Sequence, residues 1–170
     1  PMKSNKPSSI ILIGMMGSGK TSVGKLLSEF LDYGFMDTDI EIEKAENNSI
    51  SSIFETKGEI FFRNLESNII SQIPLHDTIV ATGGGLPVFN ENMDALLGMG
   101  VLIYLKANPE QIFKRLDNSN NRPLFQNDMV EFNQILQIRS KFYEKAHHII
   151  DVSDKNLQEI CNEIKQKLNL

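Results

Sequence analysis

The sequence predicts an α/β fold in which helices cover both faces of a five-stranded parallel sheet. Five short apolar segments alternate along the chain with longer amphipathic segments, which is the pattern of repeated strand–helix units. These segments are apolar throughout rather than at alternate positions, as expected for strands that are buried on both faces. Glycine clusters follow two of them, at the strand ends where parallel sheets bind their ligands.

The length and composition agree with one globular domain. The chain has 170 residues, of which 41% are hydrophobic and 23% are charged, and both fractions are close to the averages of globular proteins. No linker or internal repeat divides the sequence, so we expect one domain over residues 1–170. The formal net charge of −5 provides no general attraction to nucleic acids or anionic membranes.

The cysteine content and the short apolar stretches indicate the compartment. The single cysteine, Cys161, excludes an intramolecular disulfide and a cysteine-based zinc cluster, and its apolar surroundings indicate a small buried helical residue. The apolar stretch at residues 10–16 is much shorter than a membrane span, which takes about 20 residues. We therefore expect a cytoplasmic, monomeric protein that binds neither membranes nor nucleic acids.

The first third of the chain is expected to form a strand, a helix and a second strand. Residues 9–13 are an apolar, β-branched run that Gly14 ends, which predicts a buried strand. Residues 21–31 place their apolar side chains at helical spacing and predict a helix with one buried face. Residues 35–37 are a brief apolar run that ends in an aspartate, and they predict the second strand.

The middle third is expected to be largely helical up to the third strand. Residues 39–73 follow a helical pattern that is interrupted near residues 47–48 and at Gly58. Residues 78–82 then form an apolar run that three successive glycines end, which predicts the third strand. A short helix is expected at residues 90–97.

The last third is expected to contain two strands and three helices. Residues 101–105 predict the fourth strand, and Pro109 suits the first turn of a helix that continues to residue 116. Residues 117–128 are polar and rich in asparagine, which indicates an exposed mobile loop. The remaining elements are a long helix, the fifth strand and a closing helix, at residues 130–146, 149–152 and 157–168.

A phosphate-binding motif lies between the first strand and the first helix. The letters GMMGSGKT at residues 14–21 satisfy G-x-x-x-x-G-K-[ST]. The backbone N–H groups of such a loop converge on a triphosphate, and glycine allows this close approach. In this pattern Lys20 reaches the outer phosphates and the hydroxyl of Thr21 takes Mg²⁺. The short chain and the lack of a guanine-reading [NT]-K-x-D motif favour a small-molecule kinase over a GTPase.

Several further residues are candidates for an acceptor site, although each has a plain structural alternative. Asp37 and Asp39, two positions apart on an extended segment, would hold a metal-bound water and accept a proton, or would simply start a helix as its N-cap and first-turn acid. Arg63 and Arg139 are either ligand contacts or exposed helix residues. The sequence TGGG at residues 82–85 indicates either backbone that a ligand approaches or a plain turn.

Arginine is scarce in this chain, because 13 of its 17 basic residues are lysines. Only a guanidinium offers the planar fork that binds a carboxylate or a phosphate through two hydrogen bonds. Each arginine is therefore a candidate ligand contact. The four are Arg63, Arg115, Arg122 and Arg139.

Taken together, these motifs resemble the shikimate kinase family over nearly the whole chain. They are GMMGSGKT at 14–21, DTD at 37–39, GEIFFR at 58–63, TGGG at 82–85, RPLF at 122–125 and RSKFYE at 139–144. The resemblance implies a P-loop fold like that of the nucleoside monophosphate kinases, with strand order 2-3-1-4-5, a substrate-binding helical region at about 39–73 and a mobile lid at about 117–128. It implies that ATP phosphorylates the 3-hydroxyl of shikimate, giving shikimate 3-phosphate and ADP on the route to chorismate and the aromatic amino acids.

The resemblance also implies nucleotide-binding and catalytic roles for individual residues. Thr21 would bind Mg²⁺, with Asp37 assisting through a water, and Lys20 would act on the phosphates during catalysis. Arg122 would move in with the lid onto the phosphates, and Arg115 would lie over the adenine. The nucleotide phosphates would be held by Gly17, Ser18, Gly19, Lys20, Thr21 and Ser22.

The same resemblance implies a shikimate site. Asp39 would bind the shikimate hydroxyls and accept the proton, while Arg63 and Arg139 would bind the carboxylate. Gly84 would offer its backbone to the substrate.

Two other functions stay open at this point. A gluconate kinase would share the P-loop and the lid but is expected to lack the GEIFFR and TGGG motifs. A nucleotide-binding regulatory module without catalysis is disfavoured by Lys20, Thr21, Asp37, Asp39 and Arg122. No chemistry is assigned to His76, His147 and His148, whose spacing does not suit a metal site.

Overall fold

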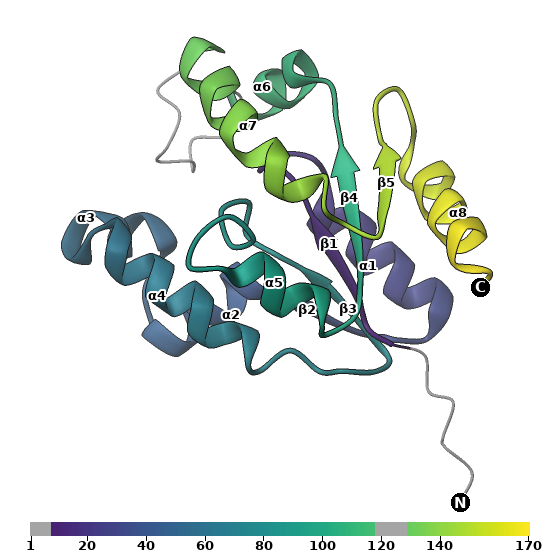
Figure 1. The fold of residues 1–170 in the computed structure, drawn as a ribbon, viewed down its shortest axis with the longest axis horizontal. Helices are drawn as coiled ribbons and strands as arrows, with labels where there is room; N and C mark the ends of the chain where they lie inside the picture. The colour runs from purple at the N-terminus through teal and green to yellow at the C-terminus, as the bar shows by residue number, and fades with distance from the viewer. Residues whose placement is uncertain (1–7, 118–128) are drawn as a thin grey trace, which may run out of the picture.

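A five-stranded parallel sheet forms the centre of the molecule, in a computed structural model that describes residues 8–117 and 129–170 (Figure 1). The strand order is β2-β3-β1-β4-β5, and every adjacent pair is parallel. Both features confirm the prediction. The strands are β1 (Ile10–Ile13), β2 (Gly34–Asp37), β3 (Thr78–Ala81), β4 (Val101–Lys106) and β5 (His148–Asp151).

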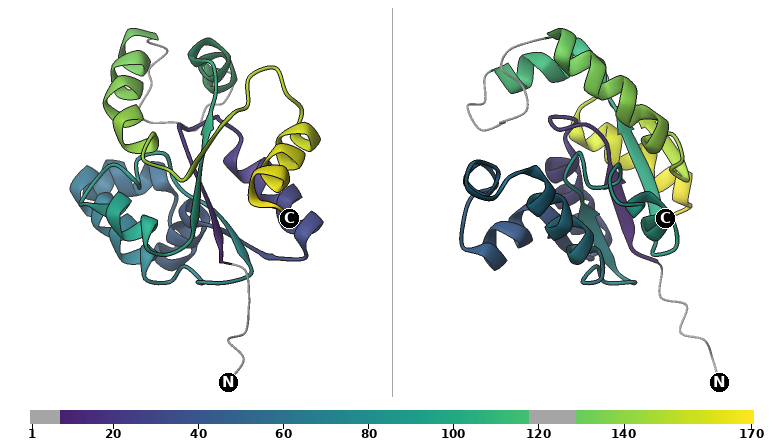
Figure 2. Two further views of the ribbon diagram at one scale, coloured as in Figure 1. Left: turned by 45° about the vertical axis from the view of Figure 1, so that its right-hand side comes forward. Right: turned by 60° about the vertical axis from the view of Figure 1, so that its left-hand side comes forward.

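Helices cover both faces of this sheet (Figures 1 and 2). They are α1 (Lys20–Leu31), α2 (Thr38–Glu46), α3 (Ile50–Lys57), α4 (Glu59–Ile70), α5 (Asn92–Leu97), α6 (Pro109–Asp117), α7 (Met129–Tyr143) and α8 (Leu157–Leu168). None of those in the described ranges combines the length and the apolar character that a membrane crossing requires. Arg122 and all but the first residue of the expected lid at 117–128 lie outside the described residues.

The sheet separates two apolar cores, as the uniformly apolar strands predicted. Ile11 and Ile13 of β1 face a core that includes side chains of α4, α5 and α7. Ile10 and Leu12 face a second core, which is covered by α1 and α8. Cys161 of α8 is fully buried in this second core, which confirms its expected structural role.

The expected helical region at 39–73 divides into α2, α3 and α4 at the predicted places. α2 ends at Asn47, which has a left-handed φ of 50°, and the Ser49 hydroxyl caps α3 by accepting from the Ser52 amide at 3.1 Å. Gly58, with φ 84°, separates α3 from α4.

Element boundaries differ from the predicted ones by a few residues, and local geometry explains the larger differences. α5 begins at Asn92 rather than at residue 90, because Asn90 and Glu91 have left-handed φ values of 54° and 58°. α7 ends at Tyr143 rather than at residue 146, because the amides of Lys145 and Ala146 bond to carbonyls only three residues back.

Candidate active site

The loop between β1 and α1 wraps around the N-terminus of α1. A Cβ atom on Gly14 would lie 2.7 Å from the carbonyl oxygen of Leu105, so only glycine allows the loop to pass this close to β4. Gly17 and Gly19 have φ values of 80° and 94°. This backbone path surrounds the positive end of α1 with amide groups, which is the arrangement that binds phosphate.

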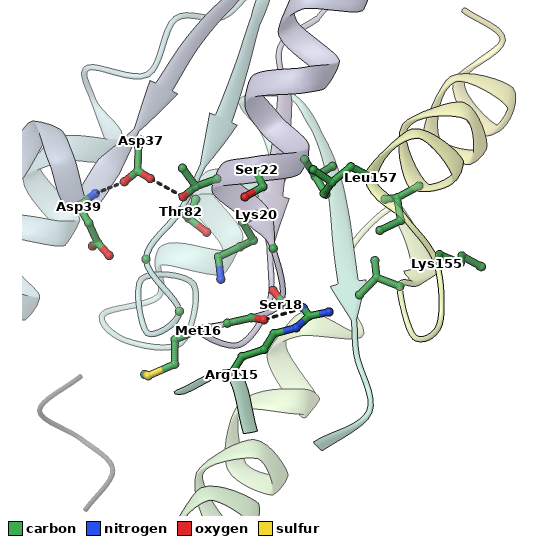
Figure 3. Close-up of a pocket in the computed structure, with 18 of the residues that line it drawn as sticks. Met16, Ser18, Lys20, Ser22, Asp37, Asp39, Thr82, Arg115, Lys155 and Leu157 are labelled. Atoms are coloured by element: carbon green, nitrogen blue, oxygen red, sulfur yellow. Dashed lines mark hydrogen bonds between the residues drawn. The ribbon is translucent and has the colours of Figure 1, made fainter. Parts of the chain in front are cut away.

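Two side chains at the start of α1 tie this loop to its surroundings. The Lys20 ammonium is buried and donates to the carbonyls of Gly14 and Met15, each at 2.8 Å. The Thr21 hydroxyl donates to Asp37 Oδ2 at 2.7 Å and so joins the loop to the end of β2. Lys20 and Asp37 both line the cavity drawn in Figure 3.

This cavity measures about 610 Å³ and opens over the P-loop. Arg115 of α6 forms part of its wall and donates to the Gly17 carbonyl at 3.1 Å. Lys155, which the sequence analysis did not single out, also lines this cavity and donates to the Asp151 carbonyl at 2.7 Å and the Glu163 carboxylate at 2.8 Å. The size, the backbone donors and the two cations suit a nucleotide.

Asp37 is the N-cap of α2, which is the structural alternative considered for it, and it also contacts the start of α1. Its Oδ1 accepts from the amides of Asp39 and Ile40 at 3.0 and 3.2 Å, which makes it the N-cap of α2, while Oδ2 accepts from Thr21. The expectation that Asp37 and Asp39 share an extended segment is wrong, because α2 begins at Thr38. The two carboxylates still line one cavity, since the N-terminus of α2 faces the P-loop.

A second cavity of about 550 Å³ adjoins the first. It extends from Asp39, past α2, α3 and α4, to Arg63 and Arg139. The two cavities therefore share a wall that includes Asp39. The residues that line both cavities are Met16, Thr21, Asp37, Asp39, Gly83 and Gly84.

Two buried arginines from separate helices lie in the second cavity. Arg63 of α4 is 5% exposed and Arg139 of α7 is 4% exposed, so the alternatives that made them exposed helix residues are wrong. Arg63 binds the carboxylates of Glu66 and Glu59 at 2.6 and 3.2 Å. In contrast, Nη1 of Arg139 is a buried donor without a hydrogen-bond partner within the described ranges. A buried donor of this kind is available to a polar group that enters the cavity.

Glu66 is a site residue that the sequence analysis missed. Its side chain is 1% exposed, and burial raises its pKa to about 7, although the charge of Arg63 and the hydrogen bond to it act in the opposite direction. The net charge of the second cavity around Arg63 therefore depends on whether Glu66 is protonated near neutral pH. The sequence did contain a signal for Glu66. It follows Arg63 by three residues, and this spacing places both side chains on one face of α4.

Each glycine of the triple glycine lies against a different charged side chain. A Cβ atom on Gly83 would lie 2.5 Å from Asp39 Oδ1, one on Gly84 would lie 3.2 Å from Arg139 Nη1, and one on Gly85 would overlap the Arg63 guanidinium. The Gly83 amide also donates to the Thr38 hydroxyl at 3.0 Å. The triple glycine is thus more than a plain turn, and it allows three site side chains to pack against one backbone loop.

The oxygen atoms beside the P-loop fit Mg²⁺. This ion is usually held by one or two protein oxygens, with phosphate oxygens and waters completing its shell. The Thr21 hydroxyl and the Asp37 carboxylate provide such oxygens, 2.7 Å apart. Among the described residues, no group of three or more histidine, cysteine or acidic side chains could hold a metal by itself. The site thus suits an ion shared with a bound nucleotide.

The histidines lie away from both cavities, around a hollow at the opposite end of the sheet. His147 Nδ1 accepts from the Leu102 amide at 2.9 Å, which is a structural contact. His148 is the first residue of β5 rather than a residue before it.

Comparison with known proteins identifies the family. The shikimate kinase family model matches residues 16–169. The chain belongs to the shikimate kinase family. A shikimate kinase of Bacillus cereus (strain G9842) is 39% identical over 163 residues, which cover 95% of this chain and 99% of the relative.

Solved structures agree with membership of the shikimate kinase family. The structure of shikimate kinase from Acinetobacter baumannii in complex with shikimate aligns with a TM-score of 0.91 at 32% identity, covering 96% of this chain and 93% of that one. A gluconokinase of Sinorhizobium meliloti 1021 aligns with a TM-score of 0.60 at 17% identity, covering 96% of each chain, and shares the fold alone. The chain is therefore an ATP-dependent kinase, and the shikimate kinase prediction is confirmed over the gluconate kinase and the noncatalytic module.

Proposed function

We propose that the two joined cavities bind ATP and shikimate, and that the γ-phosphoryl group passes beside Asp39 to the 3-hydroxyl of shikimate. The products are shikimate 3-phosphate and ADP. The observation that carries this assignment is the shared wall at Asp39, with two buried arginines, Arg63 and Arg139, in the second cavity alone. A small ring with hydroxyls at one end and a carboxylate at the other matches that distribution of charge.

The first cavity holds the nucleotide. The amides of the P-loop and the N-terminus of α1 bind the phosphates, and the Lys20 ammonium exchanges its carbonyl partners for phosphate oxygens. Arg115 covers the adenine, and Arg122 stays a predicted phosphate ligand. The phosphate-binding residues are Gly17, Ser18, Gly19, Lys20, Thr21 and Ser22, all of which line this cavity.

The Thr21 hydroxyl would hold Mg²⁺ directly, and the Asp37 carboxylate would hold it through a water. Support comes from their hydrogen bond of 2.7 Å, which brings both oxygens together in the cavity proposed for the nucleotide. The ion, when bound, neutralises charge on the transferred phosphoryl group. Asp37 is fixed in this position because its other oxygen caps α2.

Asp39 accepts the proton of the shikimate hydroxyl. Its carboxylate lies against Gly83, at the junction of the two cavities, and so faces both the donor and the acceptor. Phosphoryl transfer depends mostly on positioning and charge stabilisation, so the proton acceptor adds to a rate that the P-loop already supports.

Arg139 and Arg63 bind the shikimate carboxylate together. Nη1 of Arg139 provides the unpaired donor, and Gly84 lies beneath it with its backbone open to the substrate. Arg63 is held in place by Glu66 and Glu59. An entering carboxylate thus meets a preformed site, which lowers the cost of ordering on binding.

An assay of ADP release tests the reaction itself. Shikimate, gluconate and nucleoside monophosphates would be supplied in turn with ATP and Mg²⁺. Each assay would be repeated with Mn²⁺ in place of Mg²⁺ and without any metal. Only shikimate with a divalent metal is expected to release ADP at a high rate. Comparable rates with gluconate would contradict the assignment.

Calorimetric titration of shikimate tests the carboxylate site. Arg139→Ala should weaken shikimate binding about ten- to a few hundredfold, because it removes charge-assisted hydrogen bonds. Arg63→Ala would leave Glu66 buried without its partner, so Arg63→Lys is the better variant, which keeps the charge but loses the fork. Arg115→Ala is the matched control and should change only ATP binding. Unchanged shikimate affinity in Arg139→Ala would contradict the site.

A monomer in the cytoplasm is the remaining part of the proposal. Both cavities are lined by residues of one chain, so no second copy is needed to complete them. Light scattering with and without ATP measures the oligomeric state, and fractionation of cells measures the compartment.

A further inference from the structure

Tyr143 is a fully buried tyrosine at the end of α7 to which the reaction described above assigns no role. Its hydroxyl donates to the carbonyl oxygen of Gly84 at 2.5 Å and lies 3.8 Å from the sulfur of Met15 in the P-loop. Its ring packs on Tyr104 of β4, with the ring centroids 5.1 Å apart. One side chain thus connects α7 to both loops at the junction of the cavities.

Arg139 lies one helical turn before Tyr143 on α7. Burial raises the pKa of Tyr143 to about 12, while the nearby positive charge of Arg139 acts in the opposite direction. The Tyr143 hydroxyl has one proton, and it donates this proton to the Gly84 carbonyl.

This arrangement fixes the backbone of the glycine loop. The peptide that joins Gly84 to Gly85 is planar and trans, so its N–H points away from the carbonyl that Tyr143 holds. A Cβ atom on Gly84 would lie only 3.2 Å from Arg139 Nη1, so the guanidinium and the loop are in close contact. A rotation of this peptide would move the loop and Arg139 relative to each other.

We propose that Tyr143 is a positioning residue for shikimate binding, because its hydroxyl holds the Gly84 backbone in place against Arg139. The inference rests on the proposed role of the second cavity. The hydroxyl itself does not touch the substrate. A role in packing alone would need only the aromatic ring, which phenylalanine also provides.

Tyr143→Phe tests this role, and Tyr104→Phe is the matched control because it removes a hydroxyl from the neighbouring buried ring. Tyr143→Phe should raise the Kd and the KM for shikimate about five- to thirtyfold, since a buried carbonyl loses its donor and the glycine loop beside Arg139 is no longer held. The Kd for ATP should stay unchanged. Tyr104→Phe should change the shikimate Kd by less than a factor of two. Thermal unfolding of both variants measures any general loss of stability.

The outcomes separate this inference from the proposed function. If Arg139→Ala weakens shikimate binding but Tyr143→Phe does not, the positioning role is wrong and the carboxylate site stands. If neither variant changes shikimate binding, the proposed site itself fails. Equal losses of ATP and shikimate affinity in Tyr143→Phe would indicate a structural role and overturn the inference. The double variant Tyr143→Phe, Arg139→Ala should lose less free energy of shikimate binding than the sum of the losses in the two single variants.

A measurement on the wild type keeps the inference testable if Tyr143→Phe does not fold. NMR of the free protein should show one set of amide signals for Gly84 and Gly85, and shikimate should shift these signals without first ordering them. Several exchanging conformations of this loop in the free protein would overturn the positioning role.

Discussion

The cavity proposed for the nucleotide and the cavity proposed for shikimate, called the nucleotide and shikimate cavities below, are of similar size but are built in different ways. The first depends on one loop and the helix that follows it, and its main ligand groups are backbone amides. The second gathers charged side chains from α2, α4 and α7, which lie far apart in the sequence, against the glycine loop that follows β3. A site made of backbone needs a local motif, whereas a site made of side chains needs the whole fold. Substitutions should therefore act on the two cavities in separable ways.

Asp39→Asn should have the largest effect, because Asp39 belongs to both cavities. The variant keeps the size of the side chain but removes its charge, and turnover should fall about 10²- to 10⁴-fold. ATP affinity should hardly change, since the P-loop does not depend on this carboxylate. Steady-state kinetics and ATP titration measure both values. Asp94→Asn, an exposed first-turn acid on α5, is the control. Turnover within threefold of the wild type would show that Asp39 is not the proton acceptor.

A change of pH should act on the shikimate cavity through Glu66. Its pKa in the folded protein is about 7, above the ordinary value of 4.5. The neutral form thus favours folding, and stability that is present below pH 4.5 is lost as the pH rises through 7, by roughly 3 kcal/mol at 1.36 kcal/mol per unit. Glu66→Gln imitates the neutral form and should remove this loss.

Urea unfolding at pH 5 and pH 8 measures the difference. Between these two pH values, the free energy of unfolding of Glu66→Gln should rise relative to that of the wild type. Glu59→Gln is the control, because it removes a half-exposed partner of the same arginine. Parallel pH profiles for the wild type and Glu66→Gln would contradict the titration of Glu66.

Replacing a single glycine by alanine should weaken the binding of one ligand and leave the binding of the other unchanged. Gly85→Ala places a Cβ atom on the Arg63 guanidinium and should weaken shikimate binding about tenfold or more, with ATP binding unchanged. Gly19→Ala places a side chain at φ 94° and should weaken ATP binding about tenfold, because this conformation costs about 1–2 kcal/mol. Gly98→Ala, where the nearest atom is 3.7 Å away, is the control. If Gly85→Ala and Gly19→Ala each weaken ATP binding and shikimate binding equally, the two cavities do not respond separately to substitution.

Arg115→Ala should have the smallest effect. This arginine is exposed, and its hydrogen bond to the Gly17 carbonyl secures only the rim of the nucleotide cavity. ATP affinity should fall by less than about tenfold, since an exposed contact contributes roughly 0–1 kcal/mol. Shikimate affinity should not change. A hundredfold loss of ATP affinity in calorimetry would show that Arg115 contributes as much to ATP binding as the P-loop does.

Sequence patterns predicted the parts of the molecule that are local. The P-loop, the five strands and the interruption of the helical region at Gly58 each have a short signature, and the structure confirms them. The Asp37 cap of α2 was also predictable, because it depends on residues two and three positions away.

Burial was not predictable in this way. By spacing alone, Arg63 and Arg139 resemble exposed helix residues, and only the packing of α4 and α7 around the glycine loop buries them. Glu66 and Tyr143 went without a role for the same reason. Each lies inside an amphipathic helix pattern, where an acid suggests a solvated face and an aromatic residue suggests the core. Their partners are defined by the fold and not by any spacing in the sequence.

The wall that the two cavities share has a consequence for inhibitor chemistry. In the proposed site both ligands meet beside Asp39, so one molecule can be designed to carry a nucleotide mimic and a carboxylated ring on a short linker. Tethering makes the second contact intramolecular, at an effective concentration of about millimolar for a short flexible linker. The nucleotide half would supply affinity that many P-loop enzymes share. The carboxylate half would supply selectivity, since it requires a buried guanidinium with an unused donor such as that of Arg139.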